Sequence, residues 1–199
     1  AFSAGGDLSG GFVDDPLPRH AERGALAELF RTMRAVPKPI VARVNGAALG
    51  GGFGLAVAAD ITIAREDARM GTPEIDLGLW PMMISAVLVR AMPQKTLLDM
   101  MMTGRIITAA EAVDLGLVTR AVAADELDEE VETVTESLLA KSPAALALGK
   151  SAFSAMHDLD LDTALDLLQA GLTATAMTED GQEGVTAFLD KRAPDWKGR

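Results

Sequence analysis

Two patterns of apolar residues between positions 19 and 44 predict a helix followed by a strand. Between residues 19 and 35, four apolar side chains recur at intervals of three and four positions: Leu26, Leu29, Phe30 and Met33. That spacing places them on one face of a helix. Prolines at positions 37 and 39 end this helix, and the short β-branched run at residues 40–44 is typical of a strand.

The middle of the chain repeats this alternation. The apolar run at residues 49–59 predicts a helix, and residues 61–64 predict the next strand. A further extended stretch is expected at residues 70–75, leading into residues 78–81, and a last strand at residues 117–122. Strands separated by helical crossovers predict an α/β core with parallel pairing.

Helix boundaries in the second half are marked by capping residues. Thr108 and Glu111 have the spacing of a capping box, and Gly116 suits the position just past the end of that helix. Further along, Ser142 followed by Pro143 is typical of an N-cap with proline in the first turn. These signatures predict where the helices begin and end.

The remainder of the chain is expected to be helical. An acidic amphipathic helix is predicted at residues 125–140, and three helices with no strand are predicted from Ser142 to Arg199. We therefore divide the chain into a core at residues 1–140 and a helical region at residues 141–199. The apolar faces of such a region need a surface to cover them, so we expect it to pack across subunits or over the site.

Composition narrows the class of protein. Hydrophobic residues make up 49% of the 199 positions and charged residues 24%, as expected of a soluble globular domain with a helical appendage. A net charge of -11 disfavours binding to nucleic acid. The absence of cysteine excludes disulfides, thiolate catalysis and cysteine-bound metals.

No membrane span or leader is predicted. The two longest uncharged apolar runs, at residues 46–59 and 77–89, are shorter than the roughly 18 residues that a spanning helix needs. No basic and apolar signal segment opens the chain, so a cytoplasmic location is expected. His20 and His157 have no metal-ligating partner at a suitable spacing, so no metal site is expected.

Two glycine-rich turns could bind one anionic oxygen. Gly50, Gly51 and Gly52 stand where a strand gives way to a helix, and a free helix N-terminus offers backbone N–H groups to an anion. Residues 1–8 form a second turn of small residues. Two such donors make an oxyanion hole. Because residue 1 lies inside a functional loop with no strand before it, we expect the chain to be incomplete at its N-terminus.

Four ordered segments resemble the crotonase superfamily, the enoyl-CoA hydratase/isomerase family. They are residues 1–8, residues 38–52, residues 71–81 and residues 187–198. The resemblance covers essentially the whole chain. It implies a spiral of ββα units with a helical C-terminal trimerisation region, and a trimer or dimer of trimers. It also implies acyl-CoA thioester substrates, as in fatty acid metabolism, with coenzyme A carried by the substrate and no other cofactor.

The resemblance assigns roles to individual residues. The oxyanion donors would be the N–H groups of Ala4 and Gly51, and the acid/base would be Glu74. A thioester carbonyl held by two such donors makes the neighbouring α-proton acidic. The remaining positions of the substrate site would be Gly5, Gly6, Asp7, Leu8, Gly50, Pro73, Trp80, Phe188 and Lys191.

One position departs from the family pattern. Family hydratases carry a second glutamate two residues after the glycine triplet, where this chain has Gly54. A double-bond isomerase needs only one shuttling base, so the departure favours isomerisation over hydration, although some hydratase-like relatives also lack that glutamate. Asp76 is a candidate substitute, since residues two apart in an extended segment share a face.

Other interpretations remain open. A non-catalytic acyl-CoA binder or assembly subunit would keep the oxyanion loops and lose part of the acid/base pair. The acidic balance disfavours RNA binding. The methionines at positions 82–83 and 100–102 could line an acyl pocket, but such runs more commonly fill a core.

Overall fold

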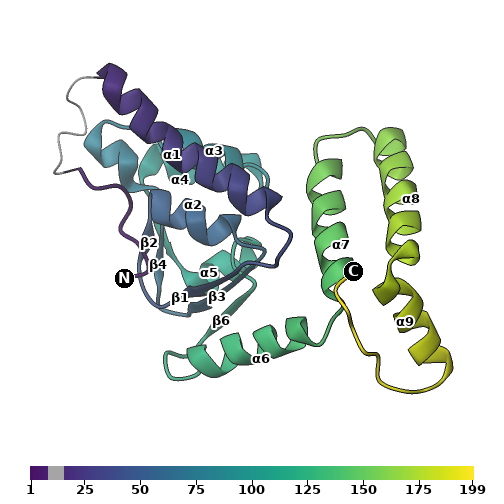
Figure 1. Ribbon diagram of the computed structural model, residues 1–199. Helices are drawn as coiled ribbons and strands as arrows, with labels where there is room; N and C mark the ends of the chain where they lie inside the picture. Colours follow the sequence, from purple (N-terminus) through teal and green to yellow (C-terminus); the bar gives the residue numbers. More distant parts are fainter. Residues whose placement is uncertain (9–15) are drawn as a thin grey trace. The chain divides into compact units, whose positions relative to one another are not determined.

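The computed structural model describes residues 1–8 and 16–199, which form two compact units (Figure 1). The core unit comprises Ala1–Met33 and Ile40–Glu132, and the helical unit comprises Arg34–Pro39 and Thr133–Arg199. Within the described residues, no helix combines the length and the apolar character needed to cross a membrane. The cytoplasmic location stays a prediction.

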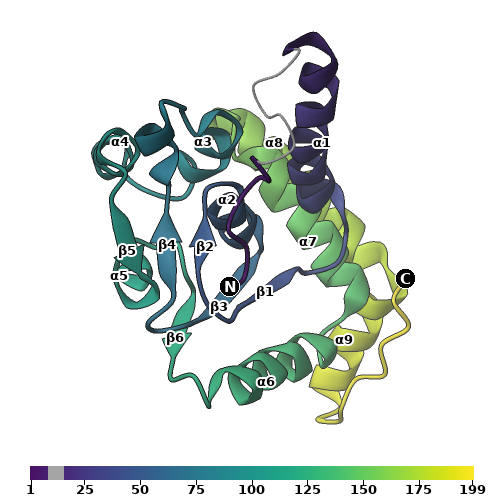
Figure 2. The same ribbon diagram turned by 90° about the vertical axis from the view of Figure 1, so that its left-hand side faces the viewer.

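The core unit contains two three-stranded sheets. In the first, β1 (Val41–Val44), β3 (Ile61–Arg65) and β6 (Arg120–Val122) pair in parallel in the order β1-β3-β6. In the second, β4 (Arg69–Gly71) lies between β2 (Ala48–Leu49) and β5 (Ile106–Thr108), as Figure 2 shows. The parallel pairing is confirmed for three of these four contacts, whereas β5 runs antiparallel to β4 and was not predicted.

Seven helices of the described part begin in the core unit. They are α1 (Pro16–Ala35), α2 (Gly51–Ala58), the 3₁₀ helix η1 (Pro73–Leu77), α3 (Met82–Leu88), α4 (Gln94–Thr103), α5 (Ala109–Asp114) and α6 (Leu127–Leu139). The predicted capping box of α5 is present, with Thr108 and Glu111 bonded reciprocally. Gly116 has φ 76°, as expected of a residue past a helix end.

Three predicted boundaries are wrong for local reasons. Leu49 belongs to β2 because its N–H donates to Ser3, so α2 begins only at Gly51. The extended stretch ends at Gly71, and Pro73 begins a 3₁₀ helix. Residues 117 and 118 remain bonded to the end of α5, which delays the last strand to residue 120. On α1, Leu29 is 43% exposed although the helical period placed it on the apolar face.

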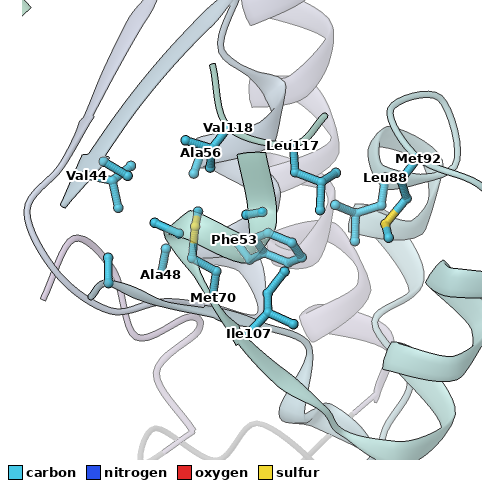
Figure 3. Close-up of a cluster of buried hydrophobic side chains, with 14 of the residues drawn as sticks. Val44, Ala48, Phe53, Ala56, Met70, Leu88, Met92, Ile107, Leu117 and Val118 are labelled. Atoms are coloured by element: carbon cyan, nitrogen blue, oxygen red, sulfur yellow. The ribbon is translucent and has the colours of Figure 1, made fainter. Parts of the chain in front are cut away.

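The main cluster of buried side chains surrounds α2. Phe53 is fully buried and lies close to Met70 and Ile107 (Figure 3). Among the methionines weighed as pocket residues, Met100 and Met101 are buried, while Met82 and Met102 are largely exposed. Core filling is therefore correct for the first two. Burial of the glycine-rich helix α2 fixes its N-terminus within the core unit.

The helical unit contains the three helices predicted after Ser142, and no strand is found between residues 143 and 199. They are α7 (Pro143–Met156), α8 (Leu161–Met177) and α9 (Glu179–Leu189). Ser142 caps α7 by accepting a hydrogen bond from the Ala145 N–H at 3.0 Å. The Trp196 indole N–H donates to the Ala140 carbonyl, so the C-terminal segment is tied to the end of α6.

Candidate active site

The glycine turn begins α2 with a free backbone donor. Gly50 has φ 53° and ψ -125°, a conformation that favours glycine, and its N–H donates to the Gly71 carbonyl at 2.9 Å. The next N–H, that of Gly51, forms no hydrogen bond with a described residue. A helix N-terminus with an unpaired N–H is suited to an anionic oxygen.

The first loop lies beside this turn. Ser3 pairs in parallel with Ala48, and its carbonyl accepts the Leu49 N–H at 2.9 Å. The N–H of Ala4, the next residue, is also without a hydrogen-bond partner in the described part of the chain. A Cβ built on Gly5 would lie 3.8 Å from the Gly51 nitrogen. The two loops predicted to act together are thus neighbours, each with a free N–H.

Gly52 allows this close approach. A Cβ at position 52 would lie 2.5 Å from both the Cβ and the carbonyl oxygen of Ser3. Those distances are far shorter than van der Waals contact, and the carbonyl is backbone that cannot turn aside. Ser3 was not singled out from the sequence, since its contact with Gly52 joins segments about fifty positions apart.

The carboxylate of Glu74 reaches the same turn. Glu74 follows Pro73 in the first turn of η1, and a Cβ built on Gly50 would lie 2.8 Å from its Oε1 atom. Its Oε2 atom is buried without a hydrogen-bond partner among the described residues. Burial raises the pKa of the Glu74 carboxyl above its usual range, against a smaller opposing effect of its own backbone N–H. A carboxylate in this state is a good proton acceptor.

Asp76 is directed elsewhere. A Cβ built on Gly104, at the end of α4, would lie 3.1 Å from its Oδ2 atom, and the residue is exposed. Asp76 would share a face with Glu74 only in an extended segment. In the 3₁₀ helix that is present, residues two apart point to different sides. Asp76 is therefore not placed beside the glycine turn.

The space that a side chain at position 54 would need is occupied by neighbouring residues. A Cβ on Gly54 would lie 2.3 Å from Cγ2 and 2.8 Å from Cβ of Ile84, and 3.1 Å from Cζ of Phe30. Neither Ile84 nor Phe30 was predicted from the sequence as a site residue. The glycine at 54 is thus required by the approach of α3 and α1 to α2.

The other predicted positions are distributed over both units. Trp80 is half-buried against the core cluster, two residues beyond the left-handed turn at Gly78. Gly6, Asp7 and Leu8 are exposed in the first loop. Phe188, 82% exposed, and Lys191, with φ 54°, belong to the helical unit. Their roles at the substrate stay predictions.

Metal ligation finds no support in the described residues. Among residues 1–8 and 16–199, no three His, Asp or Glu side chains form a group that could hold a metal ion. A separate apolar hollow of about 320 Å³ lies along α3 and α4 and is lined in part by Val89, Leu98 and Met101. Met101, weighed above as an acyl-pocket residue, is in this lining, whereas Ala4, Gly51 and Glu74 are not.

Comparisons with known proteins extend these observations. A family model described as "Enoyl-CoA hydratase/isomerase" matches residues 1–199. The human enoyl-CoA hydratase domain-containing protein 3, mitochondrial, is 35% identical over 98% of this chain, which spans 65% of that relative's length. The carnitinyl-CoA dehydratase of Salmonella typhi is 34% identical over 100% of this chain and 77% of its own length. The crystal structure of an enoyl-CoA hydratase from Mycobacterium smegmatis superimposes with a TM-score of 0.93 at 32% identity, covering 97% of this chain and 76% of that one.

Proposed function

The chain belongs to the enoyl-CoA hydratase/isomerase family of the crotonase superfamily, and on that premise we propose that it converts enoyl-CoA thioesters through an enolate. The observation that carries the proposal is the position of a buried carboxylate oxygen against the glycine turn. In the same place, the N–H groups of Ala4 and Gly51 have no partner among the described residues. A proton acceptor and two oxyanion donors are what enolate formation requires.

The thioester oxygen would be held by the two free N–H groups. Because Gly51 opens α2, the positive end of the helix dipole adds to its donor strength. Ser3 and the glycine at position 52 fix the separation of the two loops, so the donors need no rearrangement as charge develops. Each donor is expected to contribute about 10²–10³ in rate.

Glu74 would then take the proton from C2. The C2–H bond breaks, the proton moves to the carboxylate, and the bonding pair passes into the thioester carbonyl to give the enolate. The raised pKa of Glu74 suits this step, since a stronger base removes the proton more readily and the acid formed can return it. Return of the proton to C4 of a 3-enoyl thioester gives isomerisation.

The other predicted contacts complete the proposed site. Gly5, Gly6, Asp7, Leu8 and Gly50 would surround the thioester, with Pro73 and Trp80 beside Glu74. Phe188 and Lys191 would contact coenzyme A bound to the same or a neighbouring subunit. Exposed apolar side chains such as Phe153 and Leu172, 62% and 73% exposed, support association of the helical unit into a homotrimer or dimer of trimers.

The test of the activity is proton exchange. The protein is incubated in D₂O with 3-enoyl-CoA and 2-enoyl-CoA thioesters of equal length, and the products are analysed by mass spectrometry and NMR. Deuterium at C2 or C4 without gain of water indicates isomerisation, whereas gain of water indicates hydration. Binding of the thioester with neither proton exchange nor double-bond migration would support the non-catalytic acyl-CoA binder instead.

The oxyanion donor can be tested at a single atom. Gly51→Pro removes the N–H at the first helical position, where proline is well tolerated, and Gly51→Ala keeps it. A Cβ at this position makes only an ordinary contact, 3.7 Å from Leu26 Cδ2, so both variants should fold. We expect Gly51→Pro to lose about 10²–10³ in exchange rate relative to Gly51→Ala. Equal rates would remove this N–H from the mechanism.

A further inference from the structure

The turn after α9 contains the one residue other than glycine, in the described part of the chain, that has a positive φ angle. Lys191 lies two residues past the end of α9 and has φ 54°, at a place where glycine is the usual residue. Its N–H donates to the Phe188 carbonyl at 3.2 Å, and the Arg192 N–H donates to the Ala187 carbonyl at 3.0 Å. A residue with a side chain rarely adopts this conformation unless its surroundings hold it there.

Glu183 provides such a restraint from within α9. Its two carboxylate oxygens each accept a hydrogen bond from the Arg192 guanidinium, at 2.6 and 2.8 Å, and Oε1 also accepts the Asp195 N–H at 2.8 Å. Paired hydrogen bonds between a guanidinium and a carboxylate fix the orientation of one group relative to the other. A change of backbone conformation at Lys191 would displace both Arg192 and Asp195 from this carboxylate.

The rest of the C-terminal segment is bound to the same face of α9. The Trp196 ring lies so close to Gly184 that a Cβ there would be 3.1 Å from Cη2 of the indole. The N–H groups of residues 197 and 198 donate to Asp180 at 2.6 and 3.0 Å. Because positions 180, 183 and 184 are three and four apart, they lie on one side of the helix. This side of α9 holds residues 192–198 in a single register.

The turn presents two exposed side chains of different chemistry. Phe188 is 82% exposed, and Lys191 is exposed as well. The hydrogen bond between their backbones keeps them within one turn of each other. An ammonium group attracts phosphate, and an exposed aromatic ring offers a face on which a base can stack. The nucleotide of coenzyme A carries both phosphates and a base.

We infer that Glu183 is a positioning residue for the coenzyme end of the substrate, because its pair with Arg192 holds the left-handed turn at Lys191. The inference rests on the proposed function, in which Lys191 and Phe188 contact coenzyme A. Glu183 acts through these two side chains and not on the reacting atoms. Its loss should weaken recognition of the nucleotide and leave the chemical step unchanged.

The test compares two substrates that differ only in the nucleotide. One is a 3-enoyl-CoA, and the other is the same acyl group on pantetheine, which lacks the phosphates and the base. Glu183→Gln keeps the size of the side chain and removes the ion pair. Arg192→Lys keeps the charge but not the paired hydrogen bonds, and it covers the case in which Glu183→Gln does not fold. Glu179→Gln, which breaks an ion pair of 3.0 Å with Arg199 in the first turn of α9, is the matched control.

The measured quantities are KM and kcat for each thioester. In Glu183→Gln and Arg192→Lys we expect KM for the CoA thioester to rise about tenfold, while kcat and KM for the pantetheine thioester change less than about twofold. Loosening of the whole fold would affect the two thioesters alike. Glu179→Gln should leave both substrates unaffected.

A double variant tests whether Glu183 acts through Lys191. Lys191→Ala should raise KM for the CoA thioester by a similar factor, about tenfold, and adding Glu183→Gln should then cause little further rise. Independent roles would instead multiply the two effects. The same pantetheine thioester serves as the reference for each variant.

Two results would overturn the inference while the proposed function stands. One is a KM in Glu183→Gln that is unchanged or that rises equally on both thioesters, and the other is a double variant whose effect is the product of the single ones. If the unaltered protein catalyses neither proton exchange nor double-bond migration on the CoA thioester, the proposed function is overturned, and the inference with it.

Discussion

Each unit of this protein contains a carboxylate with at least one buried oxygen, and the two carboxylates have opposite surroundings. In the core unit, Glu74 has one oxygen buried without a partner, and burial raises its pKa. In the helical unit, Asp180 is 1% exposed and saturated with hydrogen bonds. Its donors are the Ser142 hydroxyl at 2.6 Å and the backbone N–H groups of Lys197 at 2.6 Å, Gly198 at 3.0 Å and Ala144 at 3.5 Å.

The hydrogen-bond donors around Asp180 reverse the effect of burial on the pKa of its carboxyl. Burial alone would raise the pKa of Asp180, but the hydrogen bonds, that of Ser142 foremost, outweigh it and hold the pKa below its usual range. A saturated carboxylate joins the start of α7, α9 and the C-terminal segment, while an unsaturated one remains available to a substrate proton. The partners of the carboxylate, rather than its burial, separate a structural group from a reactive one.

The largest expected effect is loss of exchange in Glu74→Gln. General acid/base catalysis contributes about 10²–10⁴ in rate, so C2 exchange on 3-enoyl-CoA should fall by about that factor. The thermal midpoint should stay equal or rise, because a neutral amide costs less to bury than a charged carboxylate. Exchange rates and melting curves of the same preparations check both parts. Retained exchange would show that another group is the base.

Asp180→Ala should give the reverse result, a loss of stability. The variant leaves the Ser142 hydroxyl and the N–H groups of Lys197 and Gly198 without their acceptor, so we expect the melting temperature to fall by several degrees. Asp166→Ala, at an exposed position of α8, is the control and should change it little. If Asp180→Ala and Asp166→Ala change the melting temperature equally, the hydrogen bonds of Asp180 do not stabilise this unit.

A pair of glycines compares the packing of the two units. Gly54→Ala forces a methyl group against Ile84 and should cost about 1–3 kcal/mol of unfolding free energy. Gly149→Ala, in α7 with no heavy atom within 4 Å of the added Cβ, should gain about 0.5–1 kcal/mol from helix propensity. Denaturant unfolding measures both. Equal effects would contradict the close approach of α3 to α2.

The smallest expected effect is a pH dependence of the helical unit. Hydrogen bonds from Arg192 and from the Asp195 N–H lower the pKa of Glu183 from 4.5 to about 2. A carboxylate with a lowered folded-state pKa adds stability that is complete above its unfolded value and lost as the pH falls. The contribution should therefore disappear between about pH 4.5 and 2. Melting temperatures across this range should fall less in Glu183→Gln. If the melting temperatures of the unaltered protein and of Glu183→Gln fall equally with pH, Glu183 is not the source of the pH dependence.

The sequence predicts the elements that short-range patterns determine. Spacing of apolar residues found α1, the capping box found α5, and the serine-proline pair found α7. The glycine triplet and the proline before Glu74 located the candidate site. The 3₁₀ helix η1 was missed because proline suits both extended and helical starts, and the three-residue strand β5 is too short to show a period.

Contacts between distant segments could not be predicted in this way. Ser3 against the glycine at 52, and Ile84 against Gly54, join positions about fifty and thirty apart, and nothing in the local composition pairs them. The resemblance to the family identified Gly54 as a missing glutamate. Only the positions of α1 and α3 supply the physical reason for the glycine.

Position 54 also limits how this chain could change by mutation. A single substitution that introduces a carboxylate there collides with the backbone-fixed Cβ of Ile84, so it is selected against before any new chemistry can be tested. A carboxylate at position 54 would require α3 to move, and α3 carries Ile84 and Leu88 of the same buried cluster as Phe53. A second carboxylate at position 54 would therefore need several substitutions around Ile84 at once, because the single substitution destabilises the fold.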